Sequence, residues 1–286
     1  MLHHYTFSVL GGDRRMIYAA EMLAMAGFRV LGFGLSEKPK GGITICETAD
    51  DAFRADFFLL PIPMSPDGKI LFAPALKSPV LISEILEKAP SHAIIFGGKT
   101  DAFSDPRILD YGAHSDFAGL NAVSTAEGAL LLALRHLTCT VNGTQVGITG
   151  FGKVGKATAA LFQAAGADVT IFARRAEVCA VASTLGYKAE PLDALAEYVS
   201  NLRCIINTIP APIIGEKILL NIKDDALILE LASAPYGVDF DFASKKGLNA
   251  ILASGLPGKY APESAGIILG QTVHSILLDA YKRSDI

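Results

Sequence analysis

The sequence predicts an α/β protein made of two Rossmann-like doubly wound domains with a cleft between them, joined by two long helices. Two observations lead to this prediction. Short apolar strands alternate with helical patterns along the chain, and residues 145–172 read as strand, glycine turn, helix and strand. Such alternation is typical of a parallel sheet with helices on both faces.

Composition excludes several classes of function. Only 19% of the 286 residues are charged, the net charge is -4 and no Lys/Arg run occurs, which argues against nucleic acid and anionic membranes as partners. No 18-residue apolar run and no basic, apolar leader is present, so we expect a cytoplasmic protein. The four cysteines form no CxxC and the six histidines show no ligand spacing, so we expect no metal site.

The glycine turn after residues 145–149 has the spacing GxGxxG. Gly150 permits the tight turn, Gly152 allows a pyrophosphate to approach the backbone, and Gly155 allows the helix to pack closely on the strand. The first N–H groups of the following helix would hold the phosphates. The residues expected to bind a dinucleotide here are Gly150, Phe151, Gly152, Lys153, Val154 and Gly155.

The end of the second strand distinguishes NADP from NAD. An NAD site usually has Asp or Glu at this point to bind the ribose hydroxyl, whereas this chain has Arg174 and Arg175. Because guanidinium groups match phosphates bidentately, we expect NADP. The alternative is a solvated strand end, with Glu177 turned toward the ribose.

The N-terminal half begins with another strand–turn–helix unit. A strand at residues 6–10 precedes Gly11-Gly12 and a helix over residues 16–26, but the third glycine is missing, so we predict no second dinucleotide site. Arg14 or Arg15 at the start of this helix would bind a substrate carboxylate. Alternatively, both arginines lie at the surface or form a salt bridge between domains.

Further elements of this half are strands at 28–33, 56–62 and 92–96 and a helix at 82–88. Loops at the strand ends make Ser65, Lys99 and Asp101 candidate cleft residues. We interpret His114 as a surface histidine, and a role as general acid or base is the weaker alternative. Ser124-Thr125-Ala126-Glu127 reads as a capping box before a helix at 129–137, which would place Thr125 and Glu127 at a helix N-terminus facing ligand.

The second half continues the alternation. We expect strands at 187–189, 204–207, 226–231 and 249–252, a helix starting at Pro191, and a last helix over 264–281. The expected domains are residues 1–123 with 265–286, and residues 124–264. The strand-end residues expected to contact the cofactor are Thr208, Ile209, Pro210, Ala232 and Ser233.

At these positions the chain resembles the A subunit of dipicolinate synthases. The resemblance covers nearly the whole chain, and its most specific part is C-terminal. The residues that carry it are Leu10-Gly11-Gly12-Asp13 with Arg15, Thr125-x-Glu127-Gly128, the GxGxxG turn, Asn207-Thr208-Ile209-Pro210, Leu231-Ala232-Ser233, Gly255-Leu256-Pro257-Gly258, Ala261-Pro262 and Ala265-Gly266.

This resemblance implies NADP-dependent oxidation of dihydrodipicolinate to dipicolinic acid (pyridine-2,6-dicarboxylate) in the mother cell of a sporulating bacterium. It also implies that the partner is the flavoprotein-like B subunit of dipicolinate synthase, and we further expect a homo-oligomer. The proposed catalytic residues are Arg15, Thr125 and Glu127, with Glu127 the weaker choice for proton removal. The expected substrate-binding residues are Arg14, Arg15, Ser124, Thr125, Pro257 and Gly258.

Two other functions stay open. A 2-hydroxy acid or alanine dehydrogenase has the same two-domain plan, but such enzymes commonly use a histidine just before the last helix, where this chain has Lys259-Tyr260. A regulatory subunit that binds NADP while its partner performs catalysis is the second alternative.

Overall fold

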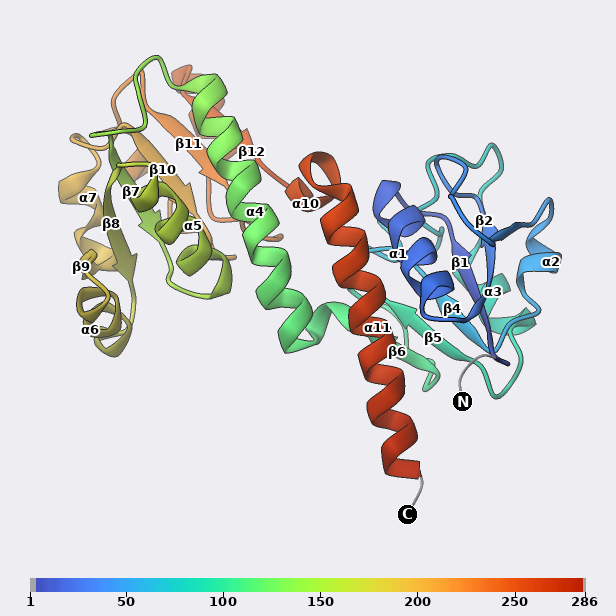
Figure 1. The fold of residues 1–286 in the computed structure, drawn as a ribbon. Coiled ribbons are helices and arrows are strands. Elements are labelled where there is room, and N and C mark those ends of the chain that lie inside the picture. The colour runs from blue at the N-terminus through green and yellow to red at the C-terminus, as the bar shows by residue number, and fades with distance from the viewer. Residues whose placement is uncertain (1–3, 285–286) are drawn as a thin grey trace. The chain divides into compact units, whose positions relative to one another are not determined.

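A computed structural model describes residues 4–284; residues 1–3 and 285–286, which the expected first domain includes, lie outside this range. The chain divides into two compact units (Figure 1). Unit 1 holds the residues up to Asn121 and those from Pro257 onward, and unit 2 is Ala122–Leu256. The second boundary precedes the expected one because Gly258 and Gly266 pack against Arg15 of unit 1.

Unit 1 is built on a parallel six-stranded sheet with the order β3-β2-β1-β4-β5-β6. The order reverses between β1 and β4, which in doubly wound sheets is where ligands bind. The strands are β1 Thr6–Leu10, β2 Arg29–Phe33, β3 Thr44–Ile45, β4 Phe57–Leu59, β5 Ile94–Gly97 and β6 Ile108–Asp110. The short strands β3 and β6 were not expected from the sequence.

The helices of unit 1 cover this sheet, and α1 and α11 lie side by side (Figure 1). A Cβ on Gly266 would lie 2.4 Å from the carbonyl oxygen of Arg15, so the glycine permits the close approach of α11 to α1. Phe7, Leu23 and Val273 belong to the core beneath them. The helices are α1 Arg14–Met25, α2 Ala49–Ala52, α3 Ile82–Lys88, η1 Tyr111–Ala113, α10 Leu256–Tyr260 and α11 Pro262–Ser284.

Helix α4, Ser115–His136, begins in unit 1 and continues in unit 2. The prediction that a capping box at Ser124 starts this helix is wrong, because residues 115–123 are already helical. Within residues 4–284, α4 alone has the length and apolar composition of a membrane-crossing helix. That is weak evidence for a span, since half of its apolar window is buried and core helices pass the same test.

Unit 2 has a second parallel six-stranded sheet, ordered β12-β11-β10-β7-β8-β9, which reverses between β10 and β7. Its strands are β7 Gln145–Thr149, β8 Asp168–Ala173, β9 Lys188–Pro191, β10 Cys204–Asn207, β11 Leu227–Glu230 and β12 Asn249–Leu252. Its helices are α5 Lys153–Ala164, α6 Ala176–Thr184, η2 Leu192–Ala194, α7 Leu195–Tyr198, α8 Glu216–Leu219 and α9 Phe240–Lys246.

The two sheets confirm the prediction of two Rossmann-like doubly wound domains. One detail of unit 2 differs from the expectation, since Pro191 ends β9 and precedes the short helix η2 instead of starting a helix itself. Proline is tolerated there because β9 is the edge strand of its sheet.

Candidate functional site

The glycine turn of unit 2 lies between β7 and α5. Gly150 has φ +87°, a conformation that L side chains rarely adopt, and its N–H donates to the Phe172 carbonyl over 2.8 Å. A Cβ on Gly155 would lie 2.3 Å from the Gly150 carbonyl oxygen, so the helix can pack on the turn only with glycine here. Gly150 is therefore required by the backbone conformation of the turn, and Gly155 by the close packing of α5 on it, as the glycine spacing indicates.

Gly152 differs from these two glycines, because no neighbouring atom would contact a side chain at this position. It is the N-cap of α5, no side chain caps the helix, and a Cβ built on Gly152 would meet nothing within 4 Å. The first N–H groups of a helix lack intrahelical partners and carry the positive end of its dipole. This helix start can therefore bind a phosphate group.

A buried polar network fixes the neighbouring strand ends of unit 2. The Asn207 amide donates to Glu230 Oε1 over 2.7 Å, while Asn207 Oδ1 accepts from the Thr149 hydroxyl over 2.5 Å. Glu230 also accepts from the N–H groups of Ala232, Gly237 and Val238. All three side chains of the network are fully buried, so their satisfied hydrogen bonds hold the ends of β7, β10 and β11 together.

This network determines the shape of the loop expected to contact the cofactor. Thr208 donates to the Thr149 carbonyl over 2.7 Å, and a Cβ on Gly150 would lie 2.6 Å from its hydroxyl. The loop after β10 thus packs directly on the glycine turn. Of the other strand-end candidates, Ala232 is buried, whereas Pro210 and Ser233 are exposed. Glu230 is not predicted from the sequence, where its only signal is a carboxylate at the end of an apolar strand.

The end of β8 carries the two arginines. Arg174 and Arg175 are both exposed, and Arg175 is the N-cap residue of α6. Neither guanidinium forms a hydrogen bond or ion pair within residues 4–284. Both groups are therefore available to an anionic ligand.

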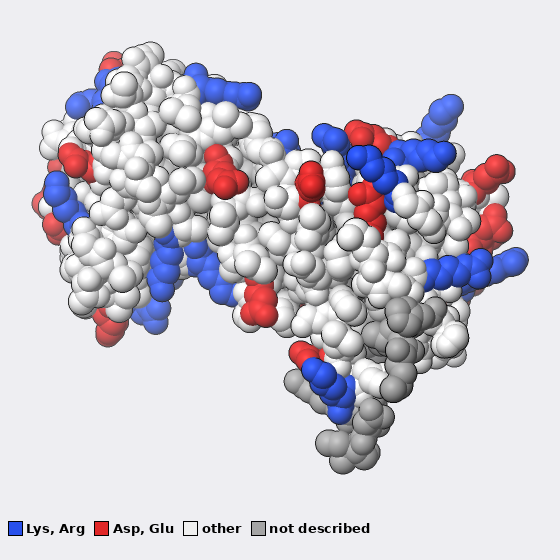
Figure 2. Space-filling view, in the orientation of Figure 1, with Lys and Arg blue, Asp and Glu red and all other residues white. Residues whose placement is uncertain are grey.

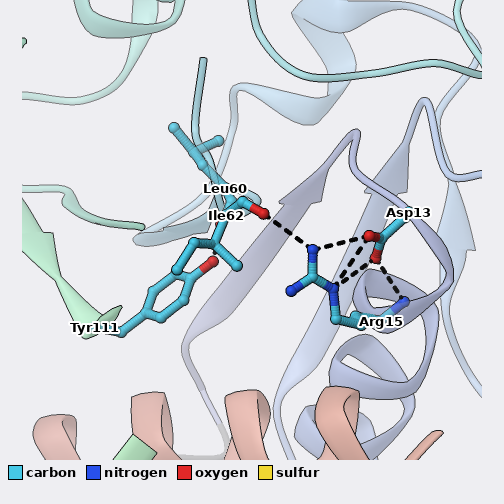
Figure 3. A network of polar contacts seen from close by, with 5 residues as sticks. All are labelled: Asp13, Arg15, Leu60, Ile62 and Tyr111. Atoms are coloured by element: carbon cyan, nitrogen blue, oxygen red, sulfur yellow. Dashed lines mark hydrogen bonds and ion pairs between the residues drawn. The ribbon is translucent and has the colours of Figure 1, made fainter. Parts of the chain in front are cut away.

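The turn at the start of α1 in unit 1 differs, because a side chain caps this helix. Asp13 is the N-cap and accepts from the N–H of Arg15 over 3.1 Å. Arg15 Nε lies 2.9 Å from Asp13 Oδ1, and Nη2 lies 2.8 Å from Asp13 Oδ2 and 2.9 Å from the Ile62 carbonyl oxygen (Figure 3). Nη1 is the one guanidinium nitrogen of Arg15 without a hydrogen bond to another described residue.

The surroundings of this ion pair complete a compact polar cluster. Tyr111 is fully buried and its hydroxyl donates to the Leu60 carbonyl over 3.0 Å. Burial raises the pKa of Tyr111 well above its usual value, so the hydroxyl stays a donor. A Cβ on Gly258 would lie 2.7 Å from Asp13 Oδ2 and 2.9 Å from Arg15 Nε. The structure thus brings Gly258 and Arg15 together.

The other candidates have more ordinary surroundings. Arg14 is half exposed and pairs with exposed Glu37 at 3.2 Å. The Ser65 hydroxyl donates to Asp67, and the N–H groups of Ile70 and Lys69 are the main reason that the pKa of Asp67 falls to about 2. This turn explains Ser65 without a ligand.

The remaining candidates differ in burial. Lys99 and Asp101 are exposed, whereas the ring nitrogen Nδ1 of His114 is buried and has no hydrogen-bond partner within residues 4–284. Within α4, Ser124 is buried, Thr125 is half-buried and Glu127 is exposed. These three do not lie at a helix N-terminus, so the proposed binding of a carboxylate to backbone N–H groups at Thr125 is wrong.

Charged side chains of both signs are spread over the molecule (Figure 2). Figure 2 shows acidic and basic side chains interspersed over the visible face, which therefore has no extended basic surface. Within residues 4–284, no group of three or more His, Cys, Asp or Glu side chains could hold a metal ion.

Comparison with known proteins gives matches along the chain. The family model for the N-terminal domain of the dipicolinate synthase A subunit matches residues 6–112. The model of the NAD binding domain of D-isomer specific 2-hydroxyacid dehydrogenase matches residues 125–239. Unit 2 is therefore a domain of the nicotinamide-dinucleotide-binding type, in agreement with its glycine turn.

Relatives match over nearly their full length. The dipicolinate synthase A subunit of Bacillus subtilis (strain 168) is 31% identical over 290 residues, which cover 98% of both sequences. The crystal structure of the A subunit from Bacillus halodurans has a TM-score of 0.87 at 27% identity, and the match covers 97% of this chain and 99% of that one. The crystal structure of the A subunit from Bacillus subtilis has a TM-score of 0.86 at 29% identity, and the match covers 99% of both chains.

A transhydrogenase from Sinorhizobium meliloti shares the fold at 17% identity and a TM-score of 0.72, and the match covers 95% of this chain and 92% of that one. The two family models and the sequence match support a dehydrogenase-like oxidoreductase that uses a nicotinamide dinucleotide. The chain belongs to the family of dipicolinate synthase A subunits.

Proposed function

We propose that the chain oxidises dihydrodipicolinate to dipicolinic acid with NADP, in the mother cell of a sporulating bacterium. The observation that carries this proposal is the match, over 98% of both sequences, to a protein named as the A subunit of dipicolinate synthase. The uncapped start of α5 and the two arginines after β8 support a dinucleotide with an additional phosphate.

In this reaction a ring C–H bond breaks, the hydride leaves the substrate and a proton is lost as the ring becomes aromatic. NADP supplies the hydride acceptor when it is bound. Aromatisation provides driving force, so the protein mainly has to orient the substrate and neutralise its two carboxylates. In unit 2, the start of α5 and the loops after β10 and β11 would hold the cofactor.

For the substrate, we propose unit 1. Asp13 already uses Nε and Nη2 of Arg15, so a carboxylate would bind Arg15 through Nη1 alone. The pair with Asp13 fixes the direction of that nitrogen, and the absence of a side chain at Gly258 permits the close packing of its backbone against the pair. Arg14, whose ion pair with Glu37 is exposed, would serve as the more mobile second cation. Glu127, which lies on α4 in unit 2, stays the weaker proposal for the proton acceptor.

The proposal can be tested on the purified chain. Dihydrodipicolinate would be generated in place by dihydrodipicolinate synthase from pyruvate and aspartate semialdehyde, while NADPH and dipicolinate are followed by their ultraviolet absorbance. We expect both signals to grow in equal amounts with NADP. A chain that binds NADP without turnover, even though substrate is present, would contradict catalysis by this chain alone.

That result would favour a regulatory role in a complex. The relative's name denotes one part of a multi-subunit enzyme, and the flavoprotein-like B subunit is the proposed partner. Adding that partner would then restore turnover. The other alternative, 2-hydroxy acid or alanine dehydrogenase chemistry, is favoured by the family match of residues 125–239. Oxidation of a 2-hydroxy acid by the chain, with no reaction on dihydrodipicolinate, would establish it.

A further inference from the structure

Unit 2 contains a cavity of about 710 Å³ beside the end of β8. Three segments form its walls. They are Arg174 directly after β8, residues between Pro191 and Ala196, and residues between Ile213 and Ile218. Arg175, the neighbour of Arg174, is not among the lining residues.

The position of this cavity follows from the sheet register. β7 and β8 are parallel neighbours with Thr149 opposite Phe172, and the Gly150 N–H donates to the Phe172 carbonyl. Arg174 therefore lies at the same sheet edge as the glycine turn, one strand further out. A dinucleotide whose phosphates bind the turn and which extends past β8 would reach the cavity with its adenosine end.

The lining combines an apolar surface with four charged side chains. Pro191, Leu192 and Ile213 offer apolar walls for a flat ring, and the charged residues are Arg174, Lys217, Asp193 and Glu216. Neither cation forms a side-chain hydrogen bond or ion pair with any residue in 4–284. A ligand that satisfies all of these groups needs an anion for the cations and an amine donor for a carboxylate.

We infer that the cavity binds the 2′-phosphoadenosine half of NADP, and that Lys217 acts with Arg174, and not Arg175, to select NADP over NAD. This inference rests on the proposed function because it names the residues behind the NADP preference. The adenine ring packs against the apolar walls, its amine donates to Asp193 or Glu216, and the 2′-phosphate binds the two cations. Lys217 lies far from Arg174 in the sequence, so the glycine fingerprint and the strand-end arginines gave no signal for it.

The test is calorimetric titration of the full chain with NADP and with NAD. We expect Lys217→Gln and Arg174→Gln each to raise the Kd for NADP about tenfold, which is the size of one charge-assisted contact, while the Kd for NAD stays unchanged. Lys217→Arg keeps the charge and should retain most of the affinity. Lys223→Gln is the control, because Lys223 is exposed and does not line the cavity.

The outcomes separate this inference from the proposed function. If the wild-type chain prefers NADP but Lys217→Gln leaves both affinities unchanged, or weakens NADP and NAD equally, the inference is wrong and the NADP-linked function stands. If Arg175→Gln alone abolishes the preference, the assignment of the cations is wrong. If the wild-type chain binds neither nucleotide, or prefers NAD, both the inference and the NADP-linked function fail.

Discussion

The two strand–turn–helix units at the start of each sheet have the same topology and opposite chemistry. In unit 1 the N-terminus of α1 is capped by the Asp13 carboxylate, which Arg15 holds in place. In unit 2 the N-terminus of α5 begins at Gly152, with no cap and no atom where a side chain would lie. A helix start that supplies its own carboxylate has no place for a phosphate, whereas a bare one does.

A glycine-rich turn after a β-strand therefore does not by itself indicate dinucleotide binding. The residue at the N-cap decides whether the helix dipole faces an internal or an external anion. Unit 1 has the same strand–turn–helix unit, but its N-cap Asp13 positions Arg15.

The largest effect is expected from Gly152→Asp, which gives α5 the cap that α1 has. The new carboxylate would accept from the free N–H groups and repel phosphates, so we expect the Kd for NADP to rise roughly 100-fold or more. Because the site is open, the melting temperature should not fall. Calorimetric titration and thermal unfolding measure both; unchanged NADP affinity would remove the phosphate site from α5.

Gly155→Ala should act through packing. Its Cβ would lie 2.3 Å from the Gly150 carbonyl oxygen, so the turn has to move, and we expect a loss of about 1–3 kcal/mol in the free energy of unfolding. NADP binding should weaken as the turn shifts. Gly152→Ala is the matched control, because its Cβ meets nothing. Equal unfolding free energies for the two variants by chemical denaturation would contradict the packing argument.

Arg15→Ala tests unit 1. It leaves the partly buried Asp13 carboxylate without its cation, and we expect a loss of about 1–3 kcal/mol in the free energy of unfolding. Turnover of dihydrodipicolinate should also be lost, while the Kd for NADP stays unchanged. A variant that loses NADP affinity to the same degree as turnover would show that Arg15 does not act on the substrate.

The smallest effect is expected from Arg14→Ala. Arg14 and Glu37 form an exposed ion pair, and such pairs contribute at most about 1 kcal/mol. The free energy of unfolding should therefore change by less than in Arg15→Ala, while the KM for substrate rises modestly. If Arg14→Ala destabilised the chain more than Arg15→Ala, the ranking of the two arginines would be reversed.

The sequence predicted the elements whose signals are local. The β7–α5–β8 unit follows from apolar runs and glycines, and β1 was placed at its observed residues. The start of α4 was misplaced because a Ser-x-x-Glu pattern also occurs within helices, where the preceding residues decide. The two-residue strand β3 is too short to show alternation.

The missed parts of the site depend on contacts between distant residues. Glu230 looks like the end of an apolar strand, and only the fold reveals that Asn207 and three backbone N–H groups surround it. Arg15 was predicted to bind substrate because an arginine near a helix start is a plausible carboxylate site. Its engagement by Asp13, two residues earlier, depends on the rotamers that the fold selects.

Calorimetric titration of the full chain with NADP, for the wild type and for Gly152→Asp, would show directly whether the open start of α5 is the one phosphate site. The chemistry of the two helix starts predicts one NADP per chain in the wild type and a Kd at least roughly 100-fold higher in the variant. Two NADP per chain, or an unchanged Kd in Gly152→Asp, would contradict the contrast between an internally capped α1 and an open α5.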